Sequence, residues 1–356
     1  MGLAILGIGT SVPSEPISQS RAAEMTSAVA GHSEAEAAKL SILYGLTGVT
    51  RRHVAMLDEG EAVPEPVSGS AKGPSTAWRM NRYEEKVGPM ALQAATEAVE
   101  RSGVDPTTFT HLITVSCTGF SAPGFDLGLI RDLNLSPSIQ RTHVGFMGCH
   151  GALNGLRVAR AIAGSEPGSR ILLCAAELCS LHFRFGGDAG QAVTNALFAD
   201  GSAALVAAPS EEVAPGSWSV VANGSYVIPN SPDAMTWKIG DHGFEMTLSP
   251  EVPSLIETHL ARWMRGWLAR HGLTIETVGS WAVHPGGPRI LDAVRTTLGL
   301  KKDTMADARE VLSGFGNISS PTILFLIDRL MRRGAERPCV ALGFGPGLVV
   351  EAALIA

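Results

Sequence analysis

The sequence predicts an α/β fold made of two similar halves that face each other. Segments typical of buried strands alternate with segments of helical periodicity along the 356 residues. Two blocks of the chain also repeat one pattern, in which a strand leads to a glycine-flanked polar residue and a buried helix follows. That residue is Cys149 in the first block and Asn317 in the second. A chain of this length is expected to bury about three quarters of its unfolded surface.

The first half contains five predicted strands, which are short and mostly apolar. They lie at residues 3–8, 111–117, 142–147, 171–176 and 202–207. Helical spacing of apolar residues predicts helices at 19–46, with a break near Gly31, and at 84–102, 125–133 and 152–163. Residues 56–76 are rich in Pro, Gly, Ser and Glu, which favours a surface loop.

The second half repeats this alternation over a shorter stretch. Strands are predicted at 280–284, 340–342 and 348–355, and a helix at 289–298. A last helix is predicted to have Ser320 as its N-cap and Pro321 at its first position. The boundary between the halves is expected near residues 208–216, which gives a first half at 1–211 and a second half at 212–356.

Composition and charge exclude several classes of protein. The 28 basic and 34 acidic residues leave a net charge of −6, which argues against a general nucleic-acid binder. No apolar run approaches the ~18 residues of a membrane-spanning helix, and the first residues lack the basic leader of a secretory signal. The five cysteines show neither paired nor zinc-type spacing, so we expect a reduced, cytoplasmic protein without a metal.

Cys149 is the candidate nucleophile. Free cysteines are most often simply buried, and that interpretation fits Cys174, which lies within an apolar run. Cys149 differs because glycines surround it at a bend between a strand and a helix. Backbone N–H groups at a helix start favour a thiolate, so we expect the pKa of this thiol to be lowered.

His284 and Asn317 are the candidate partners of this cysteine. His284 ends a strand and begins a Pro-Gly-Gly-Pro loop, and a histidine there could keep the sulfur ionised. Asn317 precedes a helix and could donate its amide to a developing oxyanion. Each could instead be an ordinary turn residue. His150 adjoins Cys149 but is the weaker partner, because the side chains of adjacent residues on a helix point about 100° apart.

Four motifs together resemble those of the type III polyketide synthases, the chalcone and stilbene synthase-like enzymes. They surround Cys149, His284 and Asn317, and the fourth is a glycine motif near the C-terminus, formed by Gly343, Phe344, Gly345, Pro346 and Gly347. The resemblance extends over nearly the whole chain. It implies a thiolase-like five-layered αβαβα fold of two duplicated halves, and a homodimer.

The resemblance also implies a reaction. Cys149 would take an acyl group from an acyl-CoA starter, and His284 and Asn317 would support the decarboxylation of malonyl-CoA. The chain would grow by two carbons in each cycle, with CoA thioesters as substrates and no other cofactor. The segment from Trp237 to Phe244 looks more like bacterial alkylpyrone and alkylresorcinol synthases than plant enzymes.

Further positions correspond to the family's cavity. Phe198 and Phe244 match the gate between the CoA tunnel and the cavity. The lining of the cavity is matched by Cys117, Cys179, His182 and the C-terminal glycine motif, which includes Phe344. The family binds CoA phosphates with basic residues. Ile42 and Leu46 stand at two of those places here, which leaves Lys39, Arg51, Arg52 and Arg289 as candidates.

Two alternatives remain open from the sequence. An initiating ketoacyl-ACP synthase would share the three polar residues but would stop after one condensation, and it lacks the Gly-Phe-Gly-Pro-Gly ending. A non-catalytic acyl-binding protein of the same fold has no need to retain all three residues. The number of extensions distinguishes a polyketide synthase from the first alternative. Loss of activity on replacing Cys149 distinguishes an enzyme from the second.

Overall fold

The computed structural model describes residues 2–13, 15–55, 72–185, 189–213 and 216–356. Most of the predicted loop at 56–76 therefore lies outside the described residues. No helix in the described ranges combines the length and the apolar composition needed to cross a membrane.

Two sets of strands with the same pairing pattern form the centre of the molecule. In the first set, β1 (Leu3–Ser11) is antiparallel to β7 (Asp200–Pro209), β7 is antiparallel to β6 (Ile171–Leu178), and β6 is parallel to β4 (His111–Ser116). In the second set, β8 (Ser219–Val227), β13 (Val349–Ile355), β12 (Cys339–Gly345) and β11 (Ser280–Val283) repeat that order and those directions. The prediction of two duplicated halves is confirmed. The boundary at residue 211 falls between β7 and β8 and stays a prediction.

The two sets join into one nine-stranded sheet. A short antiparallel contact between β1 and β8 connects them, through Leu3 with Val220 and Ala4 with Ser219. At the outer end of the first set, β5 (Gln140–Gly145) pairs with β4 and has no neighbour on its other side among the described strands.

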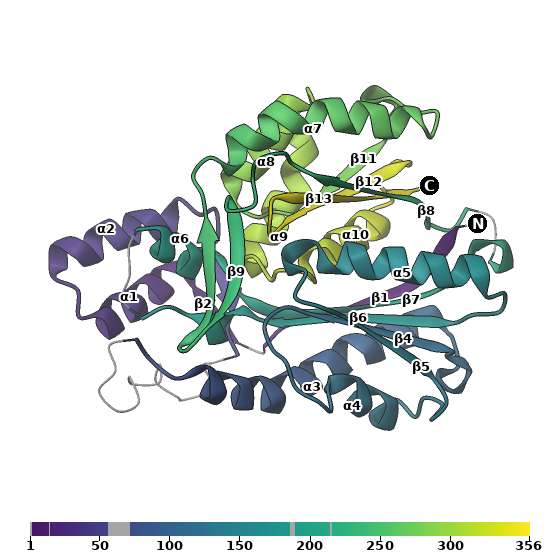
Figure 1. The fold of residues 1–356 in the computed structure, drawn as a ribbon, viewed down its shortest axis with the longest axis horizontal. Coiled ribbons are helices and arrows are strands. Elements are labelled where there is room, and N and C mark those ends of the chain that lie inside the picture. The colour runs from purple at the N-terminus through teal and green to yellow at the C-terminus, as the bar shows by residue number, and fades with distance from the viewer. Residues whose placement is uncertain (1, 14, 56–71, 186–188, 214–215) are drawn as a thin grey trace.

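Helices cover both sets and fill the space between them (Figure 1). Two central helices, α5 (Gly151–Ser165) and α10 (Thr322–Arg332), contact strands of both sets. The outer layers are α3 (Thr76–Ser102) with α4 (Phe125–Asp132) on one side, and α7 (Val252–Ala269) with α8 (Pro288–Thr297) on the other. The arrangement is the five-layered αβαβα fold that the resemblance implied.

The burial of the central elements follows from their composition. Every residue of β6 and of β7 is buried, which is typical of strands covered by helices on both faces. Residues 323–327 of α10 are apolar and buried all round, because sheets lie on both sides of this helix. Alanines on the buried face of α5 let the helix approach the strands closely.

Several smaller elements surround the site. The predicted break near Gly31 is confirmed: α1 (Gln19–Ala30) ends there, at φ +64°, and α2 (Glu34–Gly45) follows. A short pair of strands, β2 (Pro16–Ser18) and β3 (Arg51–His53), leads to the site. The sequence did not predict α6 (Ala189–Leu197), α9 (Ala306–Phe315), β8, α7, or the hairpin of β9 (Met235–Gly240) and β10 (Gly243–Leu248).

Two predicted helix starts were wrong. The helix expected at residue 84 begins at Thr76, where the Ser75 hydroxyl accepts a hydrogen bond from the backbone of Trp78. Ser320 does not cap α10, which begins at Thr322. Its hydroxyl instead donates to a buried carboxylate, that of Glu177, at 2.6 Å. A hydrogen bond to a residue distant in the sequence therefore takes the place of the predicted helix cap.

Glycines in the C-terminal motif let strand β12 lie against the turn that carries Cys149. A Cβ at Gly345 would overlap the ring of His150, and a Cβ at Gly148 would overlap Pro346. A Cβ at Gly343 would lie 3.3 Å from the Cβ of His150. The motif therefore serves close packing between the two halves.

We predict that Gly345→Ala destabilises the protein by about 1–3 kcal/mol, the usual cost of overpacking a buried site. Gly266→Ala in α7 is the matched control, since a Cβ there meets nothing within 4 Å. That change should stabilise the helix by roughly 0.5–1 kcal/mol. Urea denaturation measures both changes, and equal stability of the two variants would contradict the packing argument.

Candidate active site

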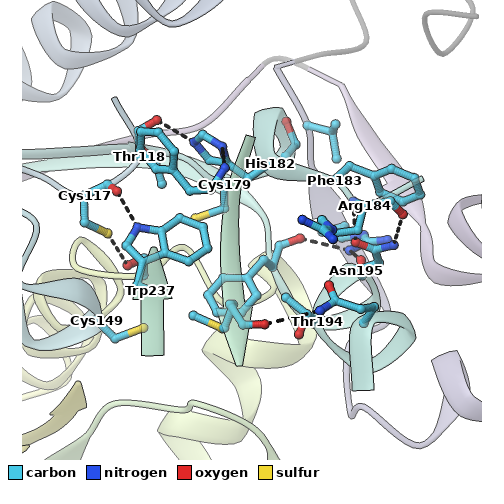
Figure 2. Close-up of a pocket in the computed structure, with 18 of the residues that line it drawn as sticks. Cys117, Thr118, Cys149, Cys179, His182, Phe183, Arg184, Thr194, Asn195 and Trp237 are labelled. Carbon is cyan, nitrogen blue, oxygen red and sulfur yellow. Dashed lines mark hydrogen bonds between the residues drawn. The ribbon is translucent and has the colours of Figure 1, made fainter. Parts of the chain in front are cut away.

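Cys149 lies in a short 3₁₀ turn, Gly148–His150, between β5 and α5. The turn needs backbone that side chains rarely adopt, with φ of +58° at Phe146 and +73° at Gly148. Cys149 is 7% exposed and lines the main pocket. Its sulfur points into that pocket (Figure 2).

Burial dominates the charge state of this thiol. It raises the pKa of Cys149 to about 11, while hydrogen bonds from the Ser319 and Asn317 side chains and from the cysteine's own backbone act in the opposite direction. The prediction of a lowered pKa was wrong. The backbone at the start of the helix has the expected effect, but desolvation of the sulfur outweighs it.

Asn317 occupies the corresponding turn of the second half, between α9 and α10. Its backbone pairs with the segment around Phe198, through bonds to Leu197 O at 2.9 Å and from Ala199 N at 3.0 Å. Its Oδ1 accepts the backbone N–H of Ser319 at 2.8 Å. The Nδ2 group is therefore the one left to donate toward Cys149.

His284 follows β11 and is 1% exposed. Its backbone N–H donates to Leu342 O at 2.8 Å, which extends the pairing with β12. Neither ring nitrogen has a hydrogen-bond partner in the part of the chain that the structure describes. Burial, and to a smaller extent His150, lower the pKa of His284 to about 3, so the ring is neutral. A preformed thiolate–imidazolium pair is absent here.

The three residues come together only in part, and neither His284 nor Asn317 is among the residues that line the pocket. Asn317 contacts Cys149 directly, and His284 is close enough to His150, the next residue after Cys149, for their charges to interact. The ring nitrogens of His284 have no partner among the described residues, whereas the amide of Asn317 is already bonded to Cys149 and to the backbone of Ser319.

The pocket beside Cys149 is partly open to solvent and leaves about 100 Å³ of room for the centres of water-sized molecules. Cys117 and Cys179 reach it from other elements (Figure 2). Most of the remaining walls are apolar, and several come from α1 and the β9–β10 hairpin. These apolar side chains are Met25, Val29, Met235, Trp237, Phe244 and Met246.

The proposed gate residues both lie on the pocket wall. Phe198 is half-buried beside Asn317, and Phe244 is 2% exposed and stacks on His182 with ring centroids 4.1 Å apart. Of the C-terminal glycine motif only Pro346 is among the residues that line the pocket. Phe344 packs in the core, so its assignment to the cavity was wrong.

The sequence reasoning gave no role to two polar residues of the site. The Ser319 hydroxyl lies 3.4 Å from the sulfur of Cys117 and also hydrogen-bonds Cys149. Glu177 is fully buried and accepts bonds from Thr118 Oγ1 at 2.7 Å and Cys117 N at 2.9 Å. A charged residue at the end of an apolar strand was the available signal for Glu177.

The candidate CoA ligands divide into two groups. Lys39, Arg51 and Arg289 are exposed, and their role in phosphate binding stays a prediction. Arg52 is 5% exposed and donates to the backbone carbonyls of Asn195 and of Phe198, the latter at 2.9 Å. Its guanidinium therefore supports the gate segment, and we no longer assign it to a phosphate.

Within the described ranges, no three His, Cys, Asp or Glu side chains are placed to hold a metal ion. All five cysteines are free and buried.

Comparison with known proteins gives full-length matches. The family description "chalcone and stilbene synthases, N-terminal domain" matches residues 2–210, and the corresponding C-terminal domain matches residues 219–356. The alpha-pyrone synthesis polyketide synthase-like protein Pks18 of Mycobacterium tuberculosis is 30% identical over 98% of this chain and 90% of its own length. The 3,5-dihydroxyphenylacetyl-CoA synthase of Amycolatopsis balhimycina is 30% identical over 98% of this chain and 91% of its own.

A solved structure agrees with these matches. The crystal structure of PKS-I from the brown alga Ectocarpus siliculosus superposes with a TM-score of 0.93 at 31% identity, and covers 99% of this chain and 98% of that one.

We predict that Ser319→Ala shifts the pH profile of Cys149 alkylation upward by about one unit. The change removes a hydrogen bond that favours the thiolate, worth roughly 1.5 kcal/mol or more. Below its pKa the thiolate fraction then falls, so labelling by iodoacetamide slows. Ser313→Ala is the matched control, because that hydroxyl bonds Thr50 and not a sulfur. An unshifted profile in the Ser319 variant contradicts this assignment.

Proposed function

Because the chain belongs to the chalcone and stilbene synthase family, we propose that it extends an aliphatic acyl-CoA starter with malonyl-CoA into an alkylpyrone, alkylresorcinol or related polyketide. The family makes the protein a type III polyketide synthase, a condensing enzyme of the acyltransferase type. We propose the identities of the starter and of the product in addition to this family assignment.

The observation that carries the proposal is Cys149 on the wall of an apolar pocket, hydrogen-bonded by the Asn317 side chain, with the unpartnered imidazole of His284 near His150, the next residue along the chain. In the first step, neutral His284 takes the thiol proton as the sulfur attacks the thioester carbonyl. The imidazolium then returns this proton to the departing CoA thiolate. His284 is neutral in the resting protein and its ring nitrogens have no partner among the described residues, so one of them is available for this proton.

Decarboxylation follows on the acylated enzyme. Loss of CO₂ from malonyl-CoA leaves an enolate, whose oxyanion the Nδ2 group of Asn317 and the ring N–H of His284 would stabilise. The enolate carbon attacks the acyl thioester and releases the sulfur of Cys149. The lengthened chain can return to Cys149 for another cycle, which makes the reaction iterative.

The pocket walls favour an aliphatic starter. Methionines from α1, β9 and β10 line it, and flexible apolar side chains adapt to an alkyl chain. The match to a protein named for alpha-pyrone synthesis points in the same direction.

We propose that two copies associate through the face around β5. This strand lies at the end of the sheet and is largely exposed. Exposed apolar side chains lie nearby at Phe120, Leu127 and Met147. The Phe120 ring lies 6.2 Å from that of Phe244, so a second copy covering it would also close the pocket wall. Free cysteines support a reduced, cytoplasmic setting.

The test of the activity is incubation of the purified chain with malonyl-CoA and acyl-CoA starters of graded length, with products read by mass spectrometry. We expect products extended at least twice from aliphatic starters, none from Cys149→Ala, and a loss of roughly 10²–10³ in rate for Asn317→Ala. Single extension with every starter would favour an initiating ketoacyl synthase. Product from Cys149→Ala would overturn the mechanism.

A second test separates gate support from phosphate binding. We predict that Arg52→Gln lowers kcat/KM by the same factor for an acyl-CoA and for the same acyl group on a truncated thiol without phosphates, because Arg52 holds Phe198. Arg51→Gln, at an exposed position, should raise KM several-fold for the acyl-CoA alone. A selective effect of Arg52→Gln on the acyl-CoA would return this residue to the phosphate site.

A further inference from the structure

The β9–β10 hairpin is a wall of the pocket that the main sheet does not hold. Its two strands pair only with each other among the described strands. Met235 and Trp237 from β9 and Phe244 and Met246 from β10 line the pocket. The position of this wall therefore depends on contacts to the body of the protein. Two of them are backbone hydrogen bonds, from Gly347 N to Met235 O and from Thr76 N to Asp241 O, each at 2.8 Å, and the others come from side chains.

His182 provides one of those contacts through both nitrogens of its ring. Nδ1 accepts the backbone N–H of Phe244 at 2.9 Å, and Nε2 bonds the carbonyl of Thr118 at 2.7 Å (Figure 2). A carbonyl can only accept and an amide N–H can only donate. The ring is therefore the neutral tautomer that carries its proton on Nε2. Burial also lowers the pKa of His182 to about 3.

The faces of the ring contact the same hairpin. The His182 ring stacks on Phe244 at an interplanar angle of 13°, and meets Trp237 edge-on with centroids 5.4 Å apart. Trp237 in turn donates its Nε1–H to the carbonyl of Cys117 at 2.7 Å. The end of β4, at Cys117 and Thr118, therefore holds the hairpin at two neighbouring points.

Arg79 fixes the segment that carries His182. This arginine is 1% exposed and donates to the carbonyls on both sides of His182, those of Leu181 and of Phe183, the latter at 3.0 Å. Gly243, which precedes Phe244, packs on the same guanidinium, and a Cβ there would lie 2.9 Å from its Nε. Arg79 thus contacts both the backbone around His182 and the hairpin at Gly243.

We propose that His182 is a positioning residue that sets the place of the β9–β10 wall and so decides which acyl chain lengths the pocket accepts. Both nitrogens are used by backbone groups, so the ring offers no proton or lone pair to a substrate. It acts through Phe244 and Trp237. This inference rests on the proposed function for its substrate, but not for the anchoring contact.

Two isosteric variants separate the two bonds. In His182→Asn the side-chain oxygen replaces Nδ1 and can still accept from Phe244, whereas in His182→Gln the terminal amide replaces Nε2 and can donate only to Thr118. We expect amide hydrogen exchange at Phe244 to quicken by about fivefold in the Gln variant, the loss of one net hydrogen bond. The Asn variant should retain slow exchange there. His271→Asn, at an exposed position, is the matched control.

The product profile gives the functional readout. With the series of acyl-CoA starters, His182→Gln should accept chain lengths that the wild type rejects, while His182→Asn and His271→Asn keep the wild-type profile. Identical profiles and exchange in the Asn and Gln variants would overturn the proposal. If the Gln variant does not fold, the Phe244 amide still provides a test. Fast exchange of this amide in the wild type overturns the proposal, and slow exchange retained in His182→Asn supports it. A wild type that makes no polyketide refutes the proposed function, while the exchange measurements still test the anchor.

Discussion

The carboxylate of Glu177 lies fully buried and accepts hydrogen bonds from both halves of the protein. One oxygen takes bonds from Thr118 and from the backbone of Cys117, and the other takes the hydroxyl of Ser320. Burial raises the pKa of Glu177, and these donors oppose that rise. A buried carboxylate is costly unless its donors stay in place. The end of β4 and the turn before α10 are therefore held in one arrangement.

Both the hairpin wall of the pocket and the residues around Cys149 depend on these two segments. The end of β4 provides the carbonyls that hold the hairpin through Trp237 and His182. The turn before α10 places Ser319 and Asn317 against the sulfur of Cys149. The chemistry and the pocket wall thus share a common support in Glu177, which is not itself among the residues that line the pocket.

The thiol of Cys149 and the imidazole of His284 are both neutral in the resting protein. Burial works against the ionisation of both Cys149 and His284, and fixed hydrogen-bond donors work in the opposite direction at the sulfur. Charge then develops only during the reaction, where preorganised donors in a low-dielectric site have their greatest effect. The gate is part of this arrangement, since the backbone of Asn317 pairs beside Phe198 and Arg52 holds the carbonyl of the same residue.

The sequence by itself determined the fold class and the duplication, and it singled out Cys149, His284 and Asn317 as candidates, because glycines and strand ends mark such turns locally. The charge states of the site residues and their contacts depended on tertiary structure. Burial reversed the expected pKa shift of Cys149, packing moved Arg52 and Phe344 away from their predicted places, and a distant carboxylate took the Ser320 hydroxyl. The hairpin wall and its histidine anchor lay beyond sequence reasoning for the same reason. Desolvation and long-range hydrogen bonds are properties of neighbours in space, which local periodicity does not encode.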